Sequence, residues 1–376
     1  MKKISLLVGT KRGAFIVSSE DFRESWKVHE PILLGHIINH VMPDPRNSSL
    51  ILMATSTGHL GPTIYRSIDG GETWKESSHP PAFPKVNNDK VSKKGKVVKS
   101  IFWLTPGHAS EPNLWYAGTV PQGLFITKDG GDNWESFEKF NSYPEAQKWM
   151  DNEGTPAGPI LHSINVDPRD KNHICLALSL GGYIETQDGG ETWFPLNKGV
   201  LADFLPDPYP EYGQCVHNLQ MSPVDPDIIY QQGHCGVYRM DRREGFWVRI
   251  GENIPKDIGD MGFPLLLHPR DPNILWVFPM DGSEVWPRTC VGGKPALYKS
   301  TNGGKNWERQ DKGFPTENAW MTVLRQGMAQ DSQDPLGIYI GTKHGEIWAS
   351  FDEGDNWQNI IRHLPEIYSL EVLVKS

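Results

Sequence analysis

The sequence of 376 residues has no long hydrophobic run and few cysteines. The apolar stretch near its start, in MKKISLLVGTKRG, is about four residues long, whereas a secretory signal needs roughly 7–15 and a membrane helix about 20. Four cysteines do not make a disulfide framework in a chain of this length. We therefore expect a cytoplasmic protein with no membrane partner.

Positive charge is scarce as well. The 37 lysines and arginines are outnumbered by 46 aspartates and glutamates, which gives a formal net charge of −9. Nucleic acids and anionic membranes attract proteins with the opposite balance, so no nucleic-acid partner is expected. The one basic cluster, at residues 85–99, is interpreted as a solvated loop.

Helical periodicity is nearly absent, with one short helical turn expected at residues 143–151, whereas glycine (38), proline (30) and tryptophan (14) are abundant. An eight-residue pattern recurs as SIDGGETW, TKDGGDNW, TQDGGETW, STNGGKNW and SFDEGDNW. Its final tryptophan, together with two others at matching positions, recurs every 48–60 residues. The seven tryptophans are Trp26, Trp74, Trp134, Trp193, Trp247, Trp307 and Trp357.

Each interval between these tryptophans has the same order of strand signals. Residues 161–166 and 174–180, for example, are apolar strands joined by a proline turn, and a third strand at 183–187 leads into the repeated turn. Four short antiparallel strands in every 40–60 residues or so predict the blade of a β-propeller.

The sequence therefore predicts an all-β fold, a seven-bladed β-propeller of four-stranded antiparallel blades in one domain spanning 1–376. Residues 367–374 are a first strand with no unit after it, and residues 1–30 supply three strands with no first strand. Together they complete the last blade and leave no sheet edge exposed between the chain ends. The predicted blades span approximately 36–77, 98–137, 158–196, 215–250, 261–309, 320–361, and 367–374 with 1–30.

The repeated turn is interpreted as a structural element. Its acidic side chain can accept hydrogen bonds from backbone N–H groups of its own turn, the glycines allow positive φ, and the tryptophan can pack between blades. The turn also lies on the rim opposite the mouth where propellers usually bind ligands. The residues at its acidic position are Asp69, Asp129, Asp188, Asn302 and Asp352.

The turns are identified as Asp-box (BNR) repeats, which occur in sialidases, sortilin-type receptors, xyloglucanases and photosystem II stability/assembly factors. Five further stretches resemble a bacterial family of soluble Asp-box propellers that is often labelled glycosyl hydrolase or assembly-factor-related. The stretches are LHSINVDPRD (161–170), PDPYPEYGQCVHN (206–218), YQQGHCGVYR (230–239), FPLLLHPRDP (263–272) and TVLRQGMAQD (322–331). The resemblance implies the fold and carries over no catalytic residue.

Histidines gather at the predicted mouth of the central channel. Counting five residues back from the turn after the first strand gives His162 and His217, which are the candidates for general acid/base or ligand roles. A histidine taken singly more often caps a strand, but the whole set predicts a polar pocket. Asp260 and Glu284 complete the catalytic candidates, and the ligand-binding candidates are His36, Lys99, His234, Arg288, Trp320 and Arg325.

A zinc site is the sharpest hypothesis at this mouth. Cys215, His217, His234 and Cys235 come from one predicted hairpin, and thiolates with imidazoles are zinc ligands. Strand alternation would, however, turn His234 and Cys235 to opposite faces unless a bulge intervenes. Buried, inert thiols are the alternative.

Two functions are expected from these features. The first is binding of a small polar molecule, a saccharide included, at the histidine-rich mouth, with glycosidase-like hydrolysis if the protein is an enzyme. The alternative is a non-catalytic scaffold or assembly factor that docks a protein partner on one rim. Sialidase chemistry is not expected, because a sialidase has six blades and clamps a carboxylate with three arginines, and here the string RIGENIP places Arg249 on an outer strand.

Overall fold

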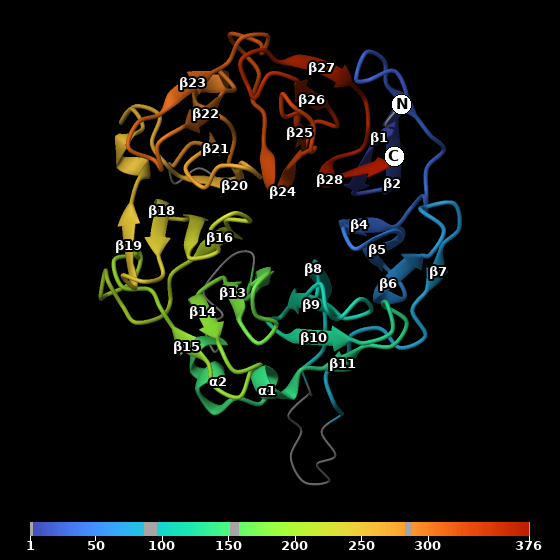
Figure 1. The fold of residues 1–376 in the computed structure, drawn as a ribbon, viewed down its shortest axis with the longest axis vertical. Coiled ribbons are helices and arrows are strands. Elements are labelled where there is room, and N and C mark those ends of the chain that lie inside the picture. The colour runs from blue at the N-terminus through green and yellow to red at the C-terminus, as the bar shows by residue number, and fades with distance from the viewer. Residues whose placement is uncertain (1–2, 86–95, 151–157, 283–287, 376) are drawn as a thin grey trace.

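The computed structural model describes residues 3–85, 96–150, 158–282 and 288–375, and these are nearly all β-structure. Figure 1 shows the sheets arranged around a central axis, with the first strand of each sheet innermost and the last at the rim. The described helices, none of which is long and apolar enough to cross a membrane, are short. They are α1 (Glu138–Asn141), α2 (Pro144–Met150) and the 3-10 turns η1 (Gly251–Asn253) and η2 (Val291–Gly293).

Five of the described sheets have four antiparallel strands each, in sequence order. They are β4 (Ile37–Asp44), β5 (Asn47–Thr57), β6 (Gly61–Ser67), β7 (Lys75–Glu76); β8 (Ser100–Pro106), β9 (Trp115–Val120), β10 (Leu124–Thr127), β11 (Glu135–Ser136); β12 (Leu161–Val166), β13 (Ile174–Leu178), β14 (Gly182–Thr186), β15 (Phe194–Pro195); β16 (Val216–Met221), β17 (Ile228–Gly233), β18 (Gly236–Asp241), β19 (Phe246–Arg249); and β20 (Gly262–Leu267), β21 (Leu275–Pro279), β22 (Leu297–Ser300), β23 (Glu308–Gln310).

The other eight strands form two antiparallel groups of four that touch through one parallel pair, Gln326 with Ser369. The second group contains both ends of the chain, because β28 pairs with β1 from Lys3↔Lys375 to Thr10↔Ile367. The two groups are β24 (Val323–Gln330), β25 (Ile338–Thr342), β26 (Ile347–Ser350), β27 (Gln358–Ile361), and β28 (Ile367–Lys375), β1 (Lys3–Thr10), β2 (Gly13–Ser19), β3 (Lys27–Val28).

The core of the described chain is divided into seven hydrophobic clusters, and each lies between two neighbouring groups of strands. Each cluster contains or contacts one of the seven tryptophans; Trp247, for example, packs with Val216 and Tyr183 between the sheets of β12–β15 and β16–β19. The recurring tryptophan therefore fills the interface between neighbouring sheets.

The Asp-Gly turn forms the hydrogen bonds expected of a structural turn. In the turn after β14, the backbone N–H of Thr192 donates to Asp188 at 2.9 Å, its hydroxyl donates at 2.5 Å, and Thr186 donates at 2.8 Å. These bonds lower the pKa of the Asp188 carboxyl to about 2, because they stabilise the charged form. These three donors all belong to the same turn as the carboxylate.

Candidate functional site

Bulged residues occur on each of the innermost strands. Each of these strands has an irregular register near its mouth end, so one or more residues step out of the ladder. Such bulges redirect side chains and often border functional sites. The residues that step out include Asn39, Phe102, His162, His217, Phe263, Arg325 and Tyr368. Asn39, Phe102, Arg325 and Tyr368 border a cavity of about 150 Å³.

The bulge on β24 contains Arg325, which borders this cavity. The register with β25 jumps from Val323 to Met328, which gives this strand a longer bulge than its counterparts. The guanidinium lies over the ring of Phe263 at 4.8 Å. Burial lowers the pKa of Arg325, and its Nε is buried without a hydrogen-bond partner. Within the described residues no carboxylate forms an ion pair with Arg325.

His162 and His217 lie beside this guanidinium, as the count from the turns predicts. Both are buried, with 0% and 3% of their surface exposed. Burial and then the charge of Arg325 lower the pKa of both imidazoles, so both are neutral near pH 7. Nδ1 of His217 bonds the carbonyl oxygen of Gly262 at 2.7 Å. Neither ring nitrogen of His162 makes a well-formed hydrogen bond, although the Val216 backbone is close enough to raise its pKa.

Three of the four predicted zinc ligands come together. The donor atoms of Cys215, His217 and His234 all lie within 4.8 Å of one another. The ring of His234 packs edge-on against those of His217 and Phe204, at 5.9 and 5.5 Å. Arg288 lies at the same end, and its charge lowers the pKa of His234 and of Cys215, although burial raises that of the thiol overall.

Several other predicted residues lie outside this group. His234 and Cys235 form the two-residue turn between β17 and β18, outside both strands, and the Cys235 Sγ donates to Asp203 at 3.1 Å. Asp260 is paired with Arg249 through contacts of 2.9 and 2.8 Å, which serves the packing of the blade. Glu284 lies outside the described residues.

The remaining ligand candidates are not among the bulged residues. His36 packs against Tyr65, Lys99 is exposed, and the side chain of Trp320 is 54% exposed beside Gly293. The sequence analysis did not select the residues at the bulges of four other innermost strands, which are Asn39, Phe102, Phe263 and Tyr368.

The signal for three of these was present in the sequence. The count of five residues back from the turn, applied at Asp44, Gly107 and His268, gives Asn39, Phe102 and Phe263. The longer bulge on β24 places Arg325 six residues before Asp331, which the count alone does not anticipate.

Glycosidase chemistry would need two carboxylates facing each other across the sugar, about 5–10 Å apart. Among the described residues near the histidines, the Asp203 carboxylate accepts a hydrogen bond from the Cys235 thiol, and the Asp281 carboxylate accepts one from the Thr289 backbone N–H.

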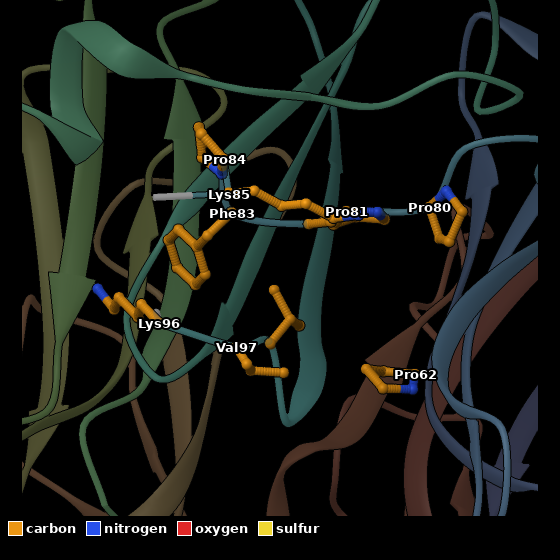
Figure 2. Close-up of a pocket in the computed structure, with 10 residues that line it drawn as sticks. Pro62, Pro80, Pro81, Phe83, Pro84, Lys85, Lys96 and Val97 are labelled. Carbon is orange, nitrogen blue, oxygen red and sulfur yellow. The ribbon is translucent and has the colours of Figure 1, made fainter. Parts of the chain in front are cut away.

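A surface groove lies elsewhere, beside the segment after β7. Its volume is about 620 Å³, and Figure 2 shows Pro80, Pro81, Phe83 and Pro84 facing Pro62 and Val97 across it. The ammonium of Lys96 lies 4.6 Å from the ring of Phe83. Its described lining residues are mostly apolar and include no nucleophile or acid–base pair.

A second group of titratable residues, His173, Cys175 and Glu185, is already satisfied. His173 bonds Asp167 at 2.9 Å and Glu185 at 3.3 Å, and Glu185 receives two further bonds from Arg242. The ion pairs lower the pKa of Glu185 despite its burial. This network joins the sheets of β12–β15 and β16–β19 and is structural.

No protein-family profile matches the chain. It is 24% identical over 217 residues to the xyloglucanase Xgh74A of Acetivibrio thermocellus, a match that covers 53% of this chain and only 22% of that protein. The structure resembles the GH74 xyloglucanase from Xanthomonas campestris, with a TM-score of 0.65, 17% identity and coverage of 96% of this chain and 52% of that one.

A structure of YCF48 bound to a D1 peptide is also similar, with a TM-score of 0.53, 16% identity and coverage of 91% of this chain and 87% of that one. The expected resemblance to glycosyl-hydrolase-type and assembly-factor propellers is confirmed. At these identities the likeness establishes the fold alone: a nearly all-β chain of four-stranded antiparallel sheets arranged as in these β-propellers.

Proposed function

We propose that this protein binds a small polar molecule carrying a carboxylate or phosphate group at the histidine-lined end of its channel. The observation that carries the proposal is Arg325, a partly buried arginine whose Nε is fully buried and which forms no ion pair among the described residues. A buried charge is costly unless it is paired. A bound anion would supply the missing partner.

The surrounding groups suit the rest of such a ligand. The neutral imidazoles of His162 and His217 offer hydrogen-bond donors and acceptors, and Phe102 and Phe263 offer ring faces. A pocket with a few converging polar groups among aromatic side chains is typical of small-molecule sites. Relatives named xyloglucanases support a saccharide framework for the ligand.

The channel depends on a closed ring. We infer that the two four-stranded groups of the eight-stranded assembly are separate blades, which makes seven in one domain, and that β28 with β1 closes the circle. The seven tryptophan clusters and the pairing of β28 with β1 support this count. Closure of this kind protects sheet edges.

A thermal-shift screen tests the ligand proposal. Neutral oligosaccharides, sugar acids and sugar phosphates are compared on the wild type, on Arg325→Gln and on Arg362→Gln, which alters an exposed arginine directly after the outer strand β27. We expect acidic sugars to raise the melting temperature of the wild type and of Arg362→Gln, and to shift Arg325→Gln little or not at all. Equal shifts in all three proteins, or shifts from neutral sugars only, would refute the role of Arg325.

The alternative expected from the sequence is a scaffold that docks a protein partner on one rim. The fold similarity to YCF48, which is seen bound to a D1 peptide, favours it as a second candidate. Pull-down with the wild type and with Arg325→Gln tests this candidate. Recovery of the same partner by both proteins, together with no binding of a small anion by the wild type, would favour the scaffold.

A further inference from the structure

We propose that Cys215, His217 and His234 form a site for a single divalent zinc-type metal ion, with a fourth coordination position open to the channel. The three donors are a thiol and two imidazoles, a combination that selects borderline-soft ions. Their mutual separations are all within 4.8 Å. Zinc bound at its usual ligand distances needs donors roughly 3.3–3.6 Å apart, so small side-chain movements would complete the site.

The hydrogen bonding of His217 prepares it as a ligand. Its Nδ1 lies 2.7 Å from the carbonyl oxygen of Gly262, which can only accept, so Nδ1 carries the proton. Nε2 is then left with its lone pair free. A backbone carbonyl that holds the far nitrogen in this way is the usual support of a metal-bound histidine.

The hairpin geometry keeps the donors on one side. The N–H of His234 donates to the carbonyl of Cys215 at 2.8 Å, and this bond closes the end of the β16–β17 ladder beside the bulge at His217. His234 packs against His217 and Phe204, which limits its rotation. The three side chains are therefore positioned by backbone pairing and packing.

Two guanidinium groups, those of Arg325 and Arg288, lie near Cys215. Three protein ligands and an open position are the arrangement of catalytic rather than structural zinc. The open position would face the channel, where an anionic ligand could contact both the metal and Arg325, so this inference extends the proposed function.

The other cysteine–histidine group is a poor competitor. His173, Cys175 and Glu185 are joined to Arg242 and Asp167 by hydrogen bonds, which a metal would have to break. The Arg242 guanidinium donates hydrogen bonds to Glu185. Among the described residues, the ligating atoms of His173 and Cys175 also have hydrogen-bond partners already. Cys175 is therefore a suitable control.

Cobalt binding to the full-length, chelator-treated protein tests the site. Co²⁺ bound by a thiolate in a tetrahedral site gives a sulfur-to-cobalt charge-transfer band, which histidine ligands alone do not give. We expect the band at one equivalent of Co²⁺ in the wild type and in the matched controls Cys235→Ser and Cys175→Ser, and its loss in Cys215→Ser. His234→Gln, which alters a half-buried side chain, should weaken cobalt binding at least tenfold.

No band in the wild type would overturn the inference, and so would a band that survives Cys215→Ser or disappears in Cys175→Ser. If Cys215→Ser does not fold, the weakened binding by His234→Gln decides the question. Anion binding is measured separately in chelator-treated protein, where it depends on Arg325 and not on Cys215. Failure of the metal site would therefore leave the anion site standing, and the reverse also holds.

Discussion

The buried ion pair between Arg23 and Asp331 ties the N-terminal strands to the preceding sheet, and its removal should destabilise the ring measurably. Arg23 is 5% exposed and Asp331 is fully buried. The guanidinium makes contacts of 2.6, 2.7 and 3.1 Å with the carboxylate and bonds the carbonyl of Pro335 at 3.2 Å. In Arg23→Met the carboxylate would keep the Tyr339 hydroxyl and two backbone donors but lose its counter-charge.

Breaking one side of a buried pair costs about 3–5 kcal/mol, because a charge stays buried without its partner. An unfolding entropy of about 2 cal/mol/K per residue gives roughly 0.8 kcal/mol/K for this chain, so the melting temperature should fall by about 4–6 °C. Calorimetry of Arg23→Met, Asp331→Asn, the double variant and the exposed control Arg362→Met measures this. We expect the double variant to recover part of the loss. A shift for Arg23→Met no larger than that for Arg362→Met would refute the reasoning.

Two further predictions concern the turns. Because the pKa of Asp188 in the folded protein is about 2, below the unfolded value of about 3.9, its stabilisation is complete above pH 4 and is lost as the pH falls through 2. Asp188→Asn should therefore destabilise the protein at pH 7 and make less difference at pH 2.5; an equal loss in melting temperature at both pH values would contradict this. Gly313→Ala should cost roughly 1–3 kcal/mol in urea unfolding, because φ is +97° and the added Cβ would lie 1.9 Å from the Trp357 carbonyl oxygen. The control Gly58→Ala, whose Cβ meets nothing within 4 Å, should be neutral, and similar costs for both would contradict the steric argument.

Much of the fold could be predicted because the signals are local and repeated. The strand expected at 161–166 is β12, and the helical turn expected at 143–151 contains α2. The repeated turn combines hydrogen bonds and packing within a few residues, so its pattern survives in the sequence. The pairing of residues 367–374 with the N-terminal strands was also predictable, because each end of the chain contains an incomplete four-strand repeat and the two incomplete repeats complement each other.

The site was only partly predictable, because bulges decide which side chains face the channel. His162 and His217 were found by counting from a turn, whereas Asp260 was chosen by its nearness to a strand start and is held by Arg249 instead. The position of Arg325 depends on the bulge of β24, which is longer than the bulges of the other described innermost strands. No residue pattern in the sequence predicts the length of this bulge. Cys235 lies apart from the other three thiol and imidazole groups, but the turn between β17 and β18 places it there, and the strand alternation assumed from the sequence does not apply to that turn.

The most direct test of the central claim is a crystal structure grown with the acidic sugar that gives the largest thermal shift. We predict that the anionic group lies within hydrogen-bond distance of the Arg325 guanidinium, with the rest of the ligand beside His162 and His217. An Arg325 guanidinium paired with a carboxylate of the protein, with the ligand bound elsewhere, would contradict the account.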